Sequence, residues 1–94
     1  MKFDLEVVAG ELLPAVRSIV ATDLSKEYGL NQEEIAEQLG ITQPAVAQYL
    51  SKSRADQEVV EKLRSDPQVE LILEDVVSKA AKNQDYSPDI AQRA

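Results

Sequence analysis

The segment of residues 32–51, QEEIAEQLGITQPAVAQYLS, constrains the fold more than any other part of the chain. Its apolar residues recur at spacings of three and four on either side of Gly40, which predicts two short helices. Glycine adopts the left-handed backbone of a helix end at no steric cost, so Gly40 marks the turn between them. Thr42 can cap the second helix with its hydroxyl, and Pro44 falls in the first turn, where a missing N–H does no harm.

The two predicted helices can pack closely against each other, because Ala36 is small at the point where they are expected to cross. Larger apolar side chains would fill the wedge between the helices, namely Ile35, Leu39, Ile41, Val46 and either Tyr49 or Leu50. A second helix over residues 42–52 would then expose Thr42, Gln43, Pro44, Ala47, Gln48 and Ser51. A helix exposed in this way can enter the major groove of DNA, where its N-terminal residues and outer face reach the base edges.

This segment resembles the helix-turn-helix of the phage-repressor class (Cro/C1-like, XRE) and aligns to that pattern without a gap. The longer stretch from Glu11 to Arg54, about half of the chain, is similar to small archaeal transcriptional regulators. Their pattern is an ELLPAVRSIVA-like helix, an LNQEEIAEQLGITQPAVAQYLS-like unit and one or two basic residues. Two features depart from these patterns. Many of the archaeal proteins carry a cysteine cluster that this chain lacks, and Pro44 stands where phage repressors often have a hydrogen-bonding residue.

The resemblance implies an all-α fold, a small lambda-repressor-like domain of about five helices, and the binding of double-stranded DNA in transcriptional regulation. Gln43 would open the recognition helix, and a glutamine there can form two hydrogen bonds with adenine. In phage repressors the glutamine that matches Gln32 binds a phosphate and supports the recognition-helix glutamine. Gln48 would be a second base reader, and Ala47 suits contact with a thymine methyl. The full set of expected DNA contacts is Gln32, Thr42, Gln43, Pro44, Ala47, Gln48, Ser51, Lys52 and Arg54.

Each of these residues also has a purely structural explanation. Thr42 is foremost a helix cap, and Gln43 is a tolerable exposed residue at a helix start. Lys52 and Arg54 suit the carboxyl end of a helix, where cations interact favourably with the macrodipole as well as with phosphates. Tyr49 is expected in the core, because its position falls on the buried side.

Composition limits the chemistry that the chain can perform. The sequence contains no cysteine and no histidine, which removes disulfides, thiol catalysis, thiolate metal sites and the commonest general base. Glu33, Glu34 and Glu37 form an acidic cluster, but a solvated helix face explains it better than a metal or catalytic site does. No glycine-rich phosphate loop is evident. We therefore expect no enzyme activity, no metal and no cofactor.

Length and hydropathy predict one small domain over residues 1–94. Ninety-four residues suffice for a single modest core. No apolar run reaches the ~18 residues that span a bilayer. The N-terminal sequence MKFDLEVV mixes acids with apolar residues, unlike a secretory signal. These features predict a soluble, cytoplasmic protein without membrane contact.

The charge balance opposes DNA binding. The formal net charge is −7, whereas DNA-binding domains are typically basic because contacts with phosphates supply much of the affinity. Residues 32–54 carry a net charge of −1 and residues 55–94 carry −4, so most of the acid lies outside the predicted DNA-binding unit. We expect weak non-specific binding that relies on a dimer and a well-matched site. Two alternatives remain, a protein–protein interaction module that keeps the fold without DNA binding, and a regulator with a small-molecule effector site in its last helices.

The residues before the central segment predict one long helix. Residues 1–10 are compatible with a short helix or an extended arm. Residues 11–28 show an amphipathic pattern with a proline near its start, and Gly29 would end this helix. Asn31 can cap the next helix, and Glu34 completes a capping-box pattern. The expected buried stripe, with Arg17, Asp23 and Lys26 mostly outside it, is Leu12, Leu13, Val16, Ile19, Val20, Leu24 and Tyr28.

The residues after the central segment predict a short helix over residues 56–64 and a long one over residues 67–82, capped by Asp66. Residues 11–64 would form the core, and residues 83–94 would form a frayed tail. The stripe of the long helix is wider than a one-sided surface helix needs, which predicts a homodimer built on this helix. That stripe is Val69, Ile72, Leu73, Val76, Val77, Ala80 and Ala81.

Overall fold

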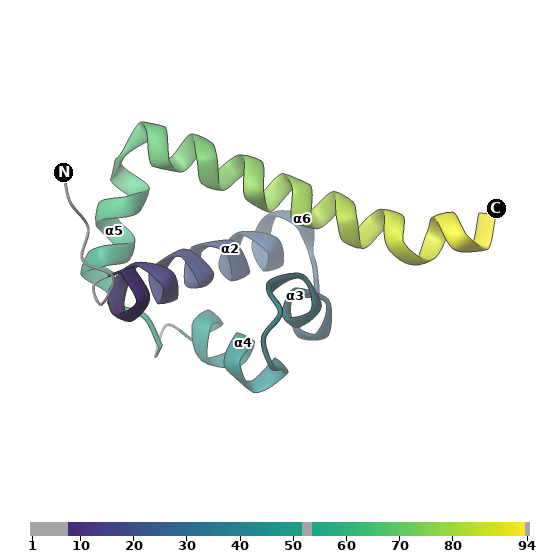
Figure 1. Ribbon diagram of the computed structural model, residues 1–94, viewed down its shortest axis with the longest axis horizontal. Coiled ribbons are helices and arrows are strands. Elements are labelled where there is room, and N and C mark those ends of the chain that lie inside the picture. Colours follow the sequence, from purple (N-terminus) through teal and green to yellow (C-terminus); the bar gives the residue numbers. More distant parts are fainter. Residues whose placement is uncertain (1–7, 52–53, 94) are drawn as a thin grey trace.

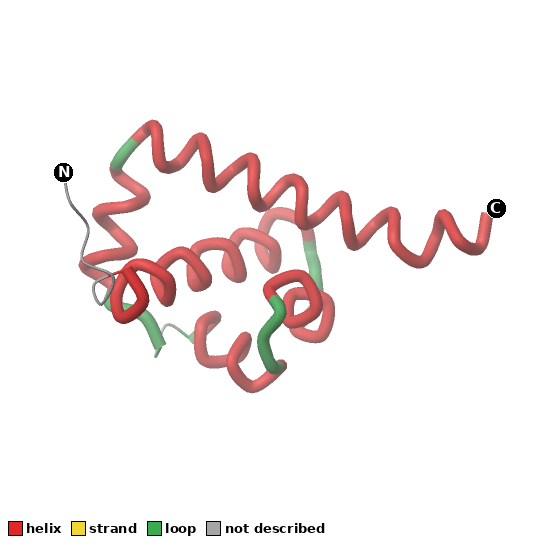
Figure 2. The backbone as a smooth tube through the Cα atoms, in the orientation of Figure 1, coloured by secondary structure: helices red, strands yellow, loops and turns green. Residues whose placement is uncertain are grey.

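The computed structural model describes the backbone of residues 8–51 and 54–93, and the side chains of residues 10–51 and 54–84. This part of the chain consists of helices and loops (Figure 2). In chain order the elements are a π-helical turn η1 (Val8–Leu12), α2 (Leu13–Tyr28), α3 (Gln32–Leu39), α4 (Gln43–Leu50), α5 (Gln57–Ser65) and α6 (Pro67–Arg93). The predicted all-α class is confirmed, and none of the described helices combines the length and apolar composition that crossing a membrane requires. Residues 1–7 of the expected arm lie outside the described residues.

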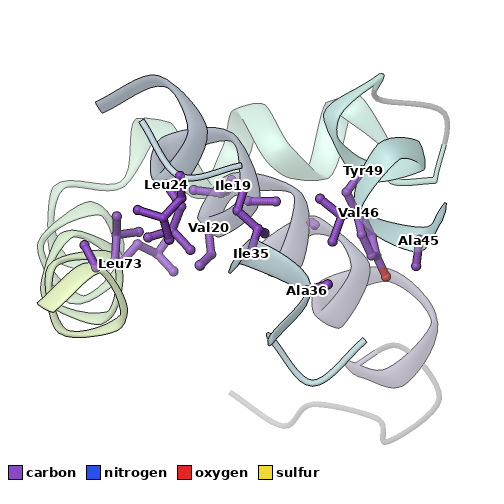
Figure 3. Close-up of a cluster of buried hydrophobic side chains, with 14 of the residues drawn as sticks. Ile19, Val20, Leu24, Ile35, Ala36, Ala45, Val46, Tyr49 and Leu73 are labelled. Carbon is purple, nitrogen blue, oxygen red and sulfur yellow. The ribbon is translucent and has the colours of Figure 1, made fainter. Parts of the chain in front are cut away.

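α2 is the central helix of the fold (Figure 1). It packs against η1, α3, α4, α5 and α6, so that a single core forms around it. In Figure 3 the side chains of α2 lie between Leu73 of α6 on one side and Val46 and Tyr49 of α4 on the other. Burial of each large apolar side chain contributes roughly 1.5–3 kcal/mol, which makes this cluster the main source of stability. The largest fully buried side chains are Ile19, Val20, Leu24, Ile35, Val46 and Val77.

Local capping signals set the ends of α2 and α3 as the sequence predicts. Gly29 ends α2 with a φ of 70°, a left-handed conformation that favours glycine. The Asn31 side chain accepts a hydrogen bond from the Glu34 N–H at 2.8 Å. In return the Asn31 N–H donates to the Glu34 carboxylate at 2.9 Å, which completes a capping box. These contacts fix where the chain leaves α2 and enters α3.

Replacing Asn31 by alanine is expected to lower the free energy of unfolding by about 1 kcal/mol, because the Glu34 N–H would lose its acceptor at the helix start. Urea denaturation followed by circular dichroism measures the change. Asn31→Asp is the matched control, since its carboxylate keeps the acceptor and suits the helix dipole. Equal losses in both variants would contradict the capping role.

The buried face of α2 differs from the predicted stripe. Asp23, expected off the stripe, is only 8 % exposed, whereas Leu13 and Tyr28 of the stripe are 42 % and 47 % exposed. The reason is a partner from α5, because Arg64 Nη2 donates to Asp23 Oδ1 at 2.9 Å. This hydrogen bond raises the pKa of Arg64, and it satisfies a carboxylate that burial would otherwise penalise. The periodicity of α2 alone cannot indicate a partner 41 residues away.

α6 is longer than predicted. The frayed tail expected over residues 83–94 is wrong, because the helix continues to Arg93. Two contacts with α3 lie just beyond the predicted end: Asn83 Nδ2 donates to Gln38 Oε1 at 2.9 Å, and Gln38 Nε2 donates to Gln84 Oε1 at 2.8 Å. These hydrogen bonds attach the first residues of the expected tail to the body of the domain.

The apolar stripe of α6 is only partly covered by the rest of the chain. Leu73 and Val77 face the core and are 5 % and 2 % exposed. Ile72 and Val76 belong to the same predicted stripe but are 63 % and 45 % exposed, and Leu71 is 70 % exposed. Leu71, Ile72 and Val76 form what we call the exposed α6 strip.

Candidate nucleic-acid interface

α3 and α4 are joined by the tight turn that the sequence predicts. Gly40 ends α3 with a φ of 66°, and its N–H donates to the carbonyl of Ala36. The Thr42 hydroxyl accepts a hydrogen bond from the Ala45 N–H at 3.2 Å, so Thr42 is the N-cap of α4. Pro44 lies in the first turn of α4, where its missing N–H leaves no bond unmade. The turn therefore sets the direction in which α4 leaves α3.

One side of α4 is fixed to the body of the domain. Val46 and Tyr49 are 0 % and 2 % exposed, as the sequence predicts, and Ala45 is buried as well. The spacing pattern did not single out Ala45, because a small side chain is weak evidence for burial. The Ser18 hydroxyl of α2 also donates to the backbone carbonyl of Tyr49 at 3.3 Å. α4 therefore has a defined orientation relative to α2.

The opposite side of α4 is exposed to solvent. Within the described part of the chain, neither the Gln32 nor the Gln43 side chain is held by a hydrogen bond, so both are accessible to a ligand. No hydrogen bond joins these two glutamines, so the support that Gln32 was expected to give Gln43 stays a prediction. Lys52 lies outside the described residues. The expected contact residues around α4 that are exposed are Thr42, Gln43, Pro44, Gln48 and Ser51, and Ala47 is half-buried.

Arg54 lies after α4 and contacts it. Arg54 Nη1 donates to Gln48 Oε1 at 2.8 Å. The guanidinium carbon also lies 5.4 Å from the centroid of the Tyr49 ring, within the range of a cation–π contact. The sequence did not predict this arrangement, since Arg54 follows the end of the helix and has no periodic relation to Gln48. The predicted phosphate contact of Arg54 stays a prediction.

The electrostatics of this surface match the acidic composition. Glu33 and Glu37 are exposed on α3, while Glu34 is half-buried in the capping box. Among the described residues from Gln32 to Arg54, Arg54 is the only cation. No group of histidine, cysteine, aspartate or glutamate side chains in the described residues could hold a metal ion. Any recognition by this surface therefore depends more on hydrogen bonds and shape than on positive charge.

Two small cavities flank α2. One of about 240 Å³ lies between α2 and α5 and includes the Asp23–Arg64 ion pair. The other, of about 320 Å³, lies between α2 and α6 and is lined by the acids Asp23, Glu27 and Glu74. Ligand pockets usually occupy ~300–1,000 Å³ and are mostly apolar. The first cavity is smaller than this range, the second lies at its lower end, and charged side chains line both. The exposed face of α4 is the stronger candidate for a functional site.

Comparison with known proteins identifies a family over the region that contains α4. A family model described as Helix-turn-helix matches residues 24–72, from the end of α2 through α3, α4 and α5 into α6. The match includes the whole of α3, α4 and α5. No curated protein and no solved structure matches the chain.

Proposed function

Because this chain belongs to the helix-turn-helix family, in its Cro/C1-type, XRE-like class of DNA-binding regulators, we propose that it is a sequence-specific transcriptional regulator. In this proposal α4 enters the major groove of DNA. The observation that carries the proposal is that α4 is amphipathic. One face packs on α2 through apolar residues, and the opposite, polar face is exposed to solvent. A recognition helix sealed beneath other helices would be unable to touch a base. The likeness to archaeal regulators remains a prediction.

The proposed contacts divide between bases and backbone. Gln43, exposed at the first position of α4, would bond an adenine through its amide oxygen and nitrogen. Ala47 would pack on a thymine methyl. Gln32, at the N-terminus of α3, would bind a phosphate together with Lys52, which fixes the register without reading the sequence. Thr42 caps α4 and would contact the backbone in addition. Pro44 and Ser51 complete the exposed surface that would face the groove.

Replacing Gln43 by alanine is expected to relax the preference for one base pair in each half-site, at a cost of about 1–3 kcal/mol for binding to the preferred sequence. The reason is that alanine cannot replace the two amide hydrogen bonds. Binding titrations against the preferred duplex and against single-base variants measure the loss. Gln68→Ala removes an exposed glutamine from α6 and serves as the control. An equal loss on every duplex would mean that Gln43 does not contact a base.

Selection of bound duplexes from a random DNA pool, followed by titration at several salt concentrations, tests the function as a whole. The affinity of a DNA-binding protein falls with salt by a factor set by its phosphate contacts. With few cations near α4, we expect a shallow salt dependence and weak non-specific binding. The alternative, a protein–protein interaction module, would be favoured if no duplex is bound even at low salt.

We further propose that the protein acts as a homodimer on a pseudo-palindromic site. Helix-turn-helix proteins commonly bind as two-fold dimers that contact half-sites about one DNA turn, ~34 Å, apart. The exposed α6 strip supports this proposal, because three large apolar side chains stay in water unless another surface covers them.

The charges of α6 suit an antiparallel pairing in that dimer. Glu74 and Asp75 are exposed in its first half, and Lys79 and Lys82 are exposed further along. A two-fold axis near Val76 would bring the lysines of one protomer close to the acids of its partner. Opposite charges around an apolar strip favour this orientation over a parallel one.

A further inference from the structure

Gln38 joins α3 to α6 through two hydrogen bonds. Its Oε1 accepts from Asn83 Nδ2 at 2.9 Å, and its Nε2 donates to Gln84 Oε1 at 2.8 Å. Both distances lie in the normal range, and we call this pair of bonds the Gln38 contact. Gln38 is half-buried and is not one of the expected DNA contacts. Its side chain therefore serves the packing of α3 on α6.

The Gln38 contact lies at one end of the stretch through which α6 packs on the core. That stretch carries Leu73, Val77 and Ala81, which are 5 %, 2 % and 2 % exposed. Apolar packing has little directional preference, and packed helices cross with a scatter of about ±15–20°. With a rise of ~1.5 Å per residue, Gln84 lies about 16 Å along the helix axis from Leu73. A change in the direction of α6 would produce a large displacement there, and the directional Gln38 contact opposes it.

α3 packs against both α2 and α6, so these three helices form a closed set of contacts (Figure 1). The direction of α6 matters because the proposed dimer forms on this helix, through the exposed α6 strip, whereas the proposed DNA contacts lie on α3 and α4. The angle between α6 and α3 would then determine how the two α4 helices of a dimer face one DNA. When that orientation is set before binding, the second half-site binds at a higher effective concentration and with less ordering cost.

We propose, on the basis of the DNA binding and the homodimer proposed above, that Gln38 is a positioning residue for binding to two half-sites. It contacts no base and no phosphate in this role. Through Asn83 and Gln84 it holds α6 at one angle to α3, so that both α4 helices of the dimer reach DNA together. Its loss reduces the additional affinity that the second half-site supplies, while the dimer and the binding of one half-site persist.

Titrations of the full-length protein against duplexes with one and with two half-sites test this role, and sedimentation measures the dimer. Gln38→Met keeps the length and the helix propensity of the side chain but removes both hydrogen bonds. We expect the affinity for two half-sites to fall by roughly tenfold, while the affinity for one half-site and the dimer dissociation constant stay within about twofold.

Gln38→Glu is the conservative variant. One carboxylate can accept hydrogen bonds from the amide groups of both Asn83 and Gln84, so the link between α3 and α6 is kept. The added negative charge would weaken binding to one and to two half-sites alike. We therefore expect Gln38→Glu to keep the wild-type ratio of the two affinities, which Gln38→Met lowers.

A distance measurement tests the orientation of α6 without DNA. The chain contains no cysteine, so Glu33→Cys and Lys82→Cys place spin labels at one exposed position each on α3 and α6. Mixing with excess unlabelled protein restricts double electron–electron resonance to distances inside one protomer. We expect a narrow distance distribution with Gln38 or Gln38→Glu and a broader one with Gln38→Met. Gln84→Met should add little to Gln38→Met, because part of the same contact is already lost.

Two results would overturn the assignment and leave DNA binding intact. An unchanged distance distribution in Gln38→Met would mean that α6 is oriented without Gln38. An equal loss of affinity for one and for two half-sites would mean that Gln38 acts on half-site binding or on folding. If the wild-type protein binds no duplex, the proposed function fails and this assignment fails with it. If it binds two half-sites as a monomer, the proposed dimer and this assignment fail together.

Discussion

Replacing Ile72 by aspartate is expected to leave the domain folded, make it monomeric and weaken its binding to a two-half-site DNA by roughly 100-fold or more. Ile72 is 63 % exposed in a single protomer, so the new carboxylate would stay in water there. In the proposed dimer the same carboxylate would lie in an apolar interface without a partner, where an unpaired charge is costly. Without the dimer, the second half-site no longer adds to the affinity.

Sedimentation velocity at micromolar concentration and titrations against one and two half-sites measure the two parts of this prediction. The affinity for a single half-site should stay the same, because α4 lies on the other side of α2 from α6 (Figure 1). Gln68→Glu is the matched control, since it adds the same unit of negative charge to α6 outside the exposed α6 strip. The dimer proposal fails if the wild-type protein sediments as a monomer or if Ile72→Asp binds the full site as tightly as the wild type.

Replacing Leu24 by alanine is expected to lower the free energy of unfolding by about 2–5 kcal/mol. Leu24 is 0 % exposed at the centre of the core, where α2 packs against its neighbours. The substitution removes buried apolar surface and leaves a cavity that the surrounding helices can fill only in part. Because small domains are stable by only ~5–15 kcal/mol, the loss should lower Tm by roughly 10 °C or more.

Thermal unfolding followed by circular dichroism, at a fixed protein concentration, measures the effect of Leu24→Ala. The fixed concentration matters because dimerisation makes Tm depend on concentration. Leu13→Ala is the matched control: it makes the same chemical change in the same helix at a residue that is 42 % exposed. We expect it to cost less than ~1.5 kcal/mol. Similar losses in the two variants would show that Leu24 is not at the centre of the core.

The features that the sequence predicted best are those set by neighbouring residues. The turn at Gly40, the caps formed by Asn31 and Thr42, and the buried side of α4 all follow from residue types within a few positions of each other. Such signals depend on backbone conformation and on helical spacing, which a sequence displays directly. The position and exposed face of α4 were therefore predictable.

The features that the sequence did not predict depend on residues far apart in the chain or outside a helical repeat. Asp23 was expected to be exposed, but Arg64 from α5 pairs with it. Gln38 of α3 binds Asn83 and Gln84, just beyond the predicted end of α6. Arg54 contacts Gln48 from beyond the end of α4. In each case the deciding partner becomes a neighbour only after the helices have packed.

α2 connects the two surfaces on which the proposed function depends, since both α4 and α6 pack directly against it. In the proposed dimer this rigid link sets the separation and the relative rotation of the two DNA-contacting helices. One base pair more or less between the half-sites would displace the second half-site by ~3.4 Å and rotate it by about 35°. The spacer length of an operator would then discriminate between genomic sites as strongly as the bases that the protein touches.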